Sequence, residues 1–131
     1  MKKLILLLRL VAAGILLQTL FFKFTGAEES IYIFSTLGVE PYGRYFAGFS
    51  ELIAAILILL PATQAIGALM ASGIMAGALL SHVLFLGIEV KGDGGLLFIL
   101  AIVVLVSSLV VLAQSKQQIF SLLGRLKAKA N

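Results

Sequence analysis

Four polar side chains stand within or at the end of long apolar stretches of this chain. They are Gln18, Lys23, Glu51 and His82. In an apolar medium an ionisable side chain must find a partner or water, because its charge costs at least about 2.5–3.5 kcal/mol at the centre of a bilayer. A carboxylate and an imidazole in a dry pocket can bind a polar head group or pass protons. These four residues are therefore the candidate polar pocket.

The four candidates fall at a similar depth if their stretches are helices. At 1.5 Å per residue, Glu51 lies about 10 Å below Arg44, and His82 lies about 9 Å from the end of its own stretch. Gln18 and Lys23 lie near the end of the first stretch. Two interpretations stay open. Either Glu51 pairs with Lys23, Arg44 or His82 and only holds the helices together, or the cluster forms a functional pocket.

The composition indicates what kind of fold must position these residues. Of 131 residues, 61% are hydrophobic and 12% are charged, whereas soluble domains have roughly 25% charged residues. A small soluble fold cannot cover its surface with so few charges. The chain has no cysteine and one histidine, which excludes disulfides, thiol chemistry, iron–sulfur clusters, cysteine-based zinc sites and a bis-histidine haem site. The composition therefore argues against a soluble enzyme or a nucleic-acid binder and favours a chain surrounded by lipid.

Long runs with few charges divide the chain into four predicted membrane-spanning helices. They cover about residues 4–22, 43–60, 62–88 and 95–113, and runs of this length can cross roughly 30 Å of hydrocarbon. Pro61 leaves almost no loop between the second and third helices. The sequence thus predicts an all-α, polytopic membrane protein. It is a single domain over residues 1–131, with four transmembrane helices in an antiparallel bundle.

The connecting segments have recognisable patterns. Residues 28–37 predict a short amphipathic helix between the first two spans, closed by Gly38. Asp93 stands before Gly94 and the fourth span, where its carboxylate can cap free backbone N–H groups. Residues 115–131 form a basic tail in which apolar residues fall roughly on one face, which predicts an interfacial C-terminal helix. Those apolar residues are Ile119, Leu122, Leu123 and Leu126.

Positive charge concentrates on the side of the predicted bundle that holds both termini. That side carries six cations and no acid, namely Lys2, Lys3, Lys116, Arg125, Lys127 and Lys129. The opposite side has three cations against five acids. The positive-inside rule then predicts that both termini are cytoplasmic. Lysines followed by leucines are also typical of a signal peptide, but Arg9 interrupts the apolar run, so we expect a retained span.

Small residues predict where helices approach one another closely. Gly73, Gly77 and Ser81 follow at four-residue spacing in the third span, and Gly48 shares a face of the second span with Glu51. A close-packed face points toward another helix, so Glu51 is predicted to point inward. The remaining charges of interest are interpreted as rim or structural charges: Arg9, Arg44 and Asp93.

Motifs along nearly the whole chain occur in the order and spacing of a known family. The first is Arg9, then Gly14 and Phe21-Phe22-Lys23-Phe24; the second is Glu51-Leu52 with a leucine-rich run to Leu60-Pro61-Ala62-Thr63. Gly-Ala-Leu-Met from Gly67 and the sequence Asp93-Gly94-Gly95 follow. In these motifs the chain resembles the DoxX-like family of small four-helix membrane proteins. The resemblance implies a location in the bacterial inner (plasma) membrane and, as in some members, a link to quinone-dependent oxidoreductases.

Three functions follow from the cluster and the resemblance. The favoured one is an accessory or anchoring subunit of a membrane redox system that binds quinone or lipid in the polar pocket. Glu51 and His82 would then meet the quinone oxygens, and Gln18 would donate a hydrogen bond. The alternative is a non-enzymatic membrane scaffold or lipid-binding module. A proton-coupled small transporter is less favoured, because the acid stands in the second helix and tryptophan is absent.

The expected cofactors and partners follow from the same residues. The sequence shows no complete catalytic constellation and no metal-ligand spacing. Quinone, which the resemblance implies, is the one expected cofactor, and its electrons would have to come from a redox partner protein. The other expected partners are the lipid bilayer and a second copy of the chain in a homo-oligomer.

Overall fold

The computed structural model describes residues 1–130, which are helical apart from short connections and contain no strand. Within this range four helical segments are long and apolar enough to cross a membrane. A chain in lipid must satisfy its backbone N–H and C=O groups internally, and a helix does so within one segment. The prediction of an all-α chain with four helices of membrane length is confirmed. These segments are α1 (Lys2–Thr25), α3 (Tyr42–Leu59), Pro61–Leu86 and α5 (Leu96–Ala130).

The third segment consists of three helical pieces. A single 3₁₀ turn, η1 (Pro61–Thr63), follows α3 almost directly and leads into α4 (Gln64–Ser81) and the π-helical turn η2 (His82–Leu86). The Thr63 hydroxyl donates a hydrogen bond of 2.8 Å to the Leu57 carbonyl, near the end of α3. Pro61 thus ends one helix and begins the next, as the sequence predicts. A shorter helix, α2 (Glu28–Thr36), lies between α1 and α3.

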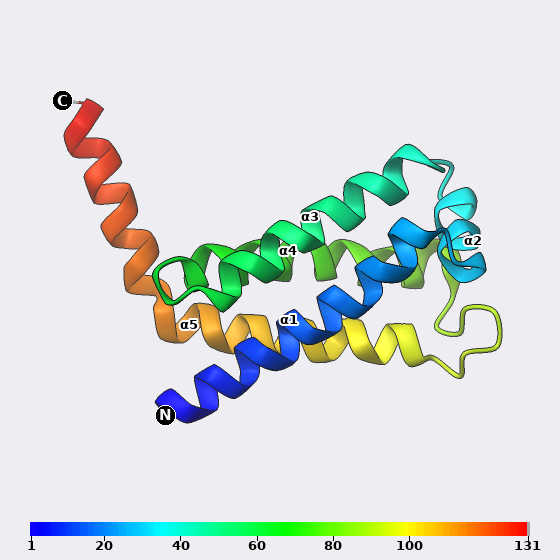
Figure 1. Ribbon diagram of the computed structural model, residues 1–131, viewed down its shortest axis with the longest axis horizontal. Helices are drawn as coiled ribbons and strands as arrows, with labels where there is room; N and C mark the ends of the chain where they lie inside the picture. The colour runs from blue at the N-terminus through cyan, green and yellow to red at the C-terminus, as the bar shows by residue number, and fades with distance from the viewer. Residues whose placement is uncertain (131) are drawn as a thin grey trace.

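The four long segments surround one core. α1 packs against α3 and α5, and α4 packs against the same two helices. Figure 1 shows that the chain reverses direction from each long segment to the next. Leu16, Ile58, Val104 and Val111 are fully buried, together with alanines that let the helices approach. Many large apolar side chains, by contrast, lie exposed on the outer surface of the helices, which is the arrangement expected of a surface that faces lipid.

The helical core has two ends with different structures (Figure 1). One, here called the α2 end, carries α2 and the connection 87–95. The other, here called the η1 end, carries the start of α1, η1 and the point where the last part of α5 turns away from the other helices.

The fourth span and the tail form one continuous helix, whereas the sequence predicts a boundary near residue 113. α5 continues through Ala130 and bends as it leaves the other helices (Figure 1). From Leu96 to Leu123 the sequence contains neither glycine nor proline, so nothing interrupts the backbone hydrogen bonds. The change from apolar to polar residues after Ala113 alters the surroundings of the helix but does not end it.

Close helix packing depends on glycines other than those expected from spacing alone. A Cβ atom on Gly67 would lie 2.2 Å from the backbone N of Ile58, so α4 touches α3 directly there. A Cβ atom on Gly48 would lie 2.9 Å from the ring of Phe24. Gly73 and Gly77 are exposed and would have nothing within 4 Å. Gly48 therefore lies at a close approach to α1, whereas an added Cβ atom on Gly73 or Gly77 would meet no other helix among residues 1–130.

Ser81 follows these two glycines on α4. Its hydroxyl donates a 2.9 Å hydrogen bond to the Gly77 carbonyl of its own helix. Four-residue spacing shows that these three residues share a face, but not which way that face points. In this structure Gly73 and Gly77 are exposed, whereas Ser81 is half-buried and lines the pocket described below.

Candidate functional site

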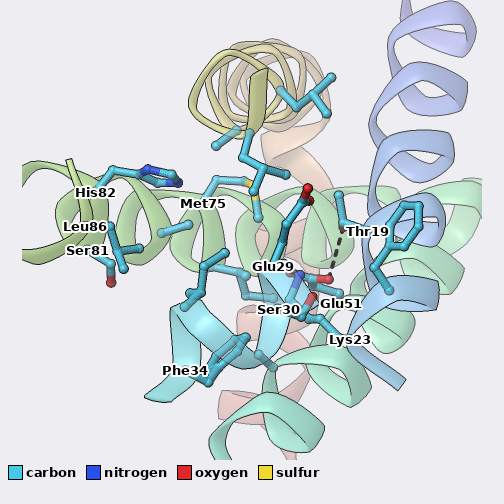
Figure 2. Close-up of a pocket in the computed structure, with 18 of the residues that line it drawn as sticks. Thr19, Lys23, Glu29, Ser30, Phe34, Glu51, Met75, Ser81, His82 and Leu86 are labelled. Carbon is cyan, nitrogen blue, oxygen red and sulfur yellow. Dashed lines mark hydrogen bonds and ion pairs between the residues drawn. The ribbon is translucent and has the colours of Figure 1, made fainter. Parts of the chain in front are cut away.

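A pocket of about 240 Å³ lies between the helices at the α2 end. α1, α3, α4, η2 and α5 supply its walls, and α2 covers it with side chains that include Ser30 and Phe34 (Figure 2). Pockets for complete drug-sized ligands usually measure about 300–1,000 Å³, so this one suits a head group or a single ring. Most of the lining is apolar. The polar lining residues are Thr19, Lys23, Glu29, Ser30, Glu51, Ser81 and His82.

An ion pair between α1 and α3 forms part of the pocket wall. Glu51 is 3% exposed, and its Oε1 lies 3.1 Å from Nζ of Lys23. The Thr19 hydroxyl donates to Oε2 over 3.3 Å (Figure 2). Thr19 and Lys23 are four residues apart on α1 and therefore share a face. Glu51 thus points into the helical core, and both of its oxygens have partners within the chain.

His82 lies on another part of the pocket, away from this ion pair (Figure 2). Its Nδ1 is 3.0 Å from the Gly87 carbonyl, and its ring meets that of Phe98 edge to face with centroids 5.6 Å apart. Because a carbonyl oxygen only accepts, Nδ1 carries a proton in this contact. The hydrogen-bond partner of His82 is therefore the backbone of its own turn rather than Glu51.

The structure brings together three of the four predicted pocket residues. Lys23, Glu51 and His82 line the pocket, but the side chain of Gln18 is exposed on α1 and is not part of the lining. The adjacent residue, Thr19, takes that place. One residue along a helix is a rotation of about 100°, which sequence depth alone does not resolve. Thr19 stands four residues before Lys23, and this spacing is the sequence signal that places both residues on the same face of α1.

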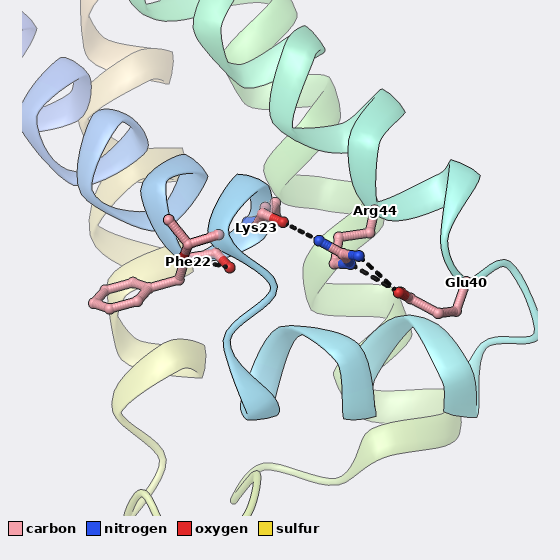
Figure 3. A network of polar contacts seen from close by, with 5 residues as sticks. Phe22, Lys23, Glu40 and Arg44 are labelled. Atoms are coloured by element: carbon pink, nitrogen blue, oxygen red, sulfur yellow. Dashed lines mark hydrogen bonds and ion pairs between the residues drawn. The ribbon is translucent and has the colours of Figure 1, made fainter.

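Arg44 fixes the end of α1 next to the pocket. It is buried, and its Nε donates to the two carboxylate oxygens of Glu40 over 2.9 and 3.0 Å (Figure 3). Its Nη1 donates to the backbone carbonyl of Lys23, and its guanidinium lies 4.5 Å from the centroid of the Tyr45 ring. Arg44 is therefore a structural charge. It holds the backbone of Lys23, the residue whose ammonium group pairs with Glu51.

A third ion pair, on the surface, joins α2 to the connection 87–95. Nζ of Lys91 lies 2.9 Å from Oε1 of Glu28 and 5.4 Å from the centroid of the Tyr32 ring. The hydrogen bond and the positive charge from Lys91 lower the pKa of Glu28. A more open cleft beside this pair shares Phe22 and Glu29 with the pocket. The pair thus fastens the cover of the pocket at its edge.

Asp93 caps α5, as its position before two glycines predicts. Oδ1 accepts hydrogen bonds from the N–H groups of Val90 and Gly95 over 3.0 and 2.8 Å, and Oδ2 accepts one from Leu97 over 3.1 Å. Partial desolvation raises the pKa of Asp93, but these donors and the nearby His82 outweigh it and lower the pKa overall. The cap fixes the first turn of α5, which contributes Leu97 to the pocket.

Polar side chains at the η1 end bond mainly to backbone groups. Nε and Nη2 of Arg9 donate to the carbonyls of Ile58 and Leu59 over 2.8 and 2.6 Å. These carbonyls belong to the last turn of α3, where intrahelical donors are missing. Arg9 therefore closes the end of α3 and has a structural role.

No family model matches this chain, and no curated protein or solved structure matches it at a significant level. Within residues 1–130, His, Asp and Glu form no group of three that could hold a metal ion. The function must therefore be argued from the pocket and its polar wall.

Proposed function

We propose that this chain is a DoxX-like, multi-pass membrane protein whose pocket binds the head group of a quinone. In this role it serves as an accessory or anchoring subunit of a membrane redox system. The observation that carries the proposal is the pocket itself, a mostly apolar cavity with a paired ammonium and carboxylate on its wall. The motifs that resemble the DoxX-like family support the same assignment.

A quinone head group matches the chemistry of this pocket. Its ring is apolar, and its two carbonyl oxygens accept hydrogen bonds. Ligand sites of this kind are mainly apolar, with a few polar groups that fix the orientation. The Lys23 ammonium uses one of its three protons toward Glu51 and keeps others to donate, and Ser30 offers a hydroxyl from the cover. The His82 ring lies on another part of the pocket wall, where it can contact the second carbonyl oxygen of the quinone.

The proposed placement in the membrane is an antiparallel four-helix bundle in the bacterial inner membrane, with both termini cytoplasmic. Four segments of membrane length and the excess of cations beside the termini support this orientation. α2 then lies as an amphipathic segment at the outer surface. Ile33 and Phe34 of α2 line the pocket, as does Leu37 directly after it, whereas Glu28 and Tyr32 are exposed.

Electron transfer in this proposal depends on a partner protein. The chain has no cysteine and a single histidine, so its own side chains cannot hold an iron–sulfur cluster or a bis-histidine haem. The role of the chain is to hold the quinone near a redox subunit and to exclude water from its head group. Co-purification of such a subunit with the tagged chain from its native membrane is the direct check on this part.

Quinone binding can be tested by filling the pocket without changing its charges. Ala78 lines the pocket, whereas Ala76 lies on the same helix, is exposed and is not part of the lining. In nanodiscs, a short-chain ubiquinone analogue should bind the wild-type protein and A76F alike, and A78F should abolish binding. Equal binding by A78F, or no binding by the wild type, would contradict the proposal.

A second variant tests the polar wall. Removal of a charged hydrogen-bond donor costs about 1.5–3 kcal/mol, so K23M should weaken quinone binding about tenfold or more. Q18L is the matched control, because Gln18 lies on the same helix outside the pocket. Extraction and mass analysis of bound molecules from the wild type and from A78F would show whether a lipid occupies the pocket instead.

The alternative function, a non-enzymatic scaffold or lipid-binding module, has one specific observation in its favour. Both oxygens of Glu51 are already paired within the chain, as expected if the pair only joins α1 to α3. This alternative predicts that the wild type binds no quinone. It also predicts that E51Q lowers the amount of folded protein and has no further effect at equal abundance.

A further inference from the structure

The last part of α5, residues 115–130, leaves the other helices at the η1 end (Figure 1). It is called the basic tail below. Phe120, Leu123 and Leu126 are 58%, 56% and 54% exposed, so the tail has an apolar surface that this chain does not cover. It also carries four cations and no acid, namely Lys116, Arg125, Lys127 and Lys129.

Apolar and basic side chains share one face of this tail. Lys116, Phe120, Leu123 and Lys127 follow at spacings of four, three and four residues, which places them in one row along a helix. The two lysines are about 16 Å apart at 1.5 Å per residue, with both apolar side chains between them. If Phe120 and Leu123 enter a lipid surface, the long lysine side chains can extend so that their ammonium groups reach the phosphates.

Polar contacts with η1 and α4 fix the direction of this tail. The Gln118 side chain donates to the Pro61 carbonyl over 2.8 Å and accepts from the Ala65 N–H over 3.1 Å. The Gln64 amide donates to the Ser115 hydroxyl. The bond from Ala65 satisfies a backbone N–H group at the start of α4, where intrahelical partners are missing. Together these bonds hold the tail at the point where it turns away from the other helices.

We propose that the basic tail binds the surface of an anionic phospholipid bilayer at the leaflet that the η1 end meets. This inference rests on the membrane placement proposed above but not on quinone binding. Lys116 and Lys127, on the same face as Phe120 and Leu123, complement anionic head groups, and each contributes about a fivefold gain in binding at such a surface. A second copy is disfavoured as the occupant, because its tail would bring the same positive charge against this one.

Fluorescent labels on the full-length protein can test this contact. The chain contains no cysteine, so L123C and S121C each provide a single site for an environment-sensitive dye. Residues two apart on a helix point in nearly opposite directions, and Ser121 is exposed. The labelled proteins are compared in nanodiscs of phosphatidylcholine alone and of phosphatidylcholine mixed with phosphatidylglycerol.

We expect the dye on L123C to shift to the blue and to resist quenching by acrylamide only in the anionic nanodiscs. The dye on S121C should stay accessible in both. K116Q/K127Q should weaken the surface-bound state about 25-fold, from a fivefold loss per cation. K2Q/K3Q removes the same charge at the same end of the molecule and should have little effect on this dye.

Three results would overturn the proposal. Equal protection of L123C in neutral and anionic nanodiscs would show that anionic lipid is not recognised. An equal effect of K2Q/K3Q would show that only net charge matters, and protection that appears only with two proteins per nanodisc would identify a second copy as the partner. The A78F variant, which tests quinone binding, should leave the dye signal unchanged, so the two proposals can fail separately.

A further variant tests the polar contacts that direct the tail. Q118A removes the side chain that bonds to Pro61 and Ala65, whereas the neighbouring Gln117 is exposed and supplies the control variant Q117A. Q118A should lower the protection of the L123C dye in anionic nanodiscs, and Q117A should not. An unchanged signal in Q118A would mean that these contacts do not position the tail.

Discussion

At the η1 end, Arg9 donates to two backbone carbonyls of α3, whereas at the α2 end Lys23 pairs with the Glu51 side chain on the wall of a pocket. Both cations lie in apolar helices and both are largely buried. The first closes the end of a helix. The second joins two helices and keeps protons that can be donated into the cavity beside it.

The contrast shows how to judge a polar residue within an apolar segment. Depth in the membrane does not separate the two cases, because a buried charge needs a partner in either one. The partner does separate them. A side chain that bonds to free backbone groups at the end of a helix has a structural role. An ion pair beside a cavity can in addition contact a ligand.

The largest expected effect comes from breaking the pair at the α2 end. Removal of one partner from a buried ion pair costs about 3–5 kcal/mol. The Lys23 side chain is 16% exposed and can partly reach water, so E51A should lower the free energy of unfolding by the lower end of that range, about 3 kcal/mol. Reversible unfolding in mixed micelles at increasing fractions of denaturing detergent measures this loss.

The double variant K23M/E51L serves as its control. Apolar side chains of similar size can replace a buried pair with little loss, so the double variant should regain most of the stability lost in E51A while losing the ability to bind quinone. If E51A lowers the free energy of unfolding by less than about 1 kcal/mol, as expected for a surface pair, the pair is exposed to water. The contrast between the two ends of the helical core would then not hold.

The next effect concerns close packing near the η1 end. A Cβ atom on Gly67 would meet the backbone of Ile58 at 2.2 Å, and backbone atoms cannot rotate aside as a side chain can. G67A should therefore destabilise the fold by about 1–3 kcal/mol, the usual cost of overpacking. G73A is the matched control on the same helix, because nothing lies within 4 Å of its added Cβ atom. Equal stabilities of the two variants would be inconsistent with the direct contact of α3 and α4.

The smallest effect concerns the cap of α5 at the α2 end. Loss of an N-cap side chain costs about 0.5–2 kcal/mol, so D93A should be less stable by that amount near neutral pH. The folded-state pKa of Asp93 is lowered; its stabilisation is therefore complete above the ordinary pKa near 4 and is lost as pH falls through the folded-state pKa. Melting curves of wild type and D93A should converge at acidic pH. Curves that stay parallel down to pH values well below 4 would refute the cap.

Much of the fold can be predicted from the sequence because it depends on local signals. Apolar runs of membrane length fix the four long segments, Pro61 fixes the turn between α3 and α4, and Asp93 fixes the start of α5. Each signal acts within a few residues of where it stands. The inward direction of Glu51 follows in the same way from Gly48 on its face.

The candidate site was predicted only in part, because it depends on helix rotation and on contacts between distant segments. A difference of one position in the rotation of α1 places Thr19 rather than Gln18 in the pocket. The rotation of α4 is likewise not fixed by residue spacing, so the spacing did not indicate that Gly73 faces outward. Lys91 pairs with Glu28, 63 residues away, and nothing in the local sequence of either residue indicates the other. Membership of the DoxX-like family and the binding of quinone remain predictions.

The unbroken course of α5 has a mechanical consequence. One continuous helix carries Leu97, Leu100 and Ala101 at the cavity and the lysines of its far extremity. No loop interrupts this helix, so its two extremities can move relative to one another only if the helix bends or loses backbone hydrogen bonds. This wall of the cavity and the lysines are therefore parts of one helical element, with a bend but no hinge loop between them.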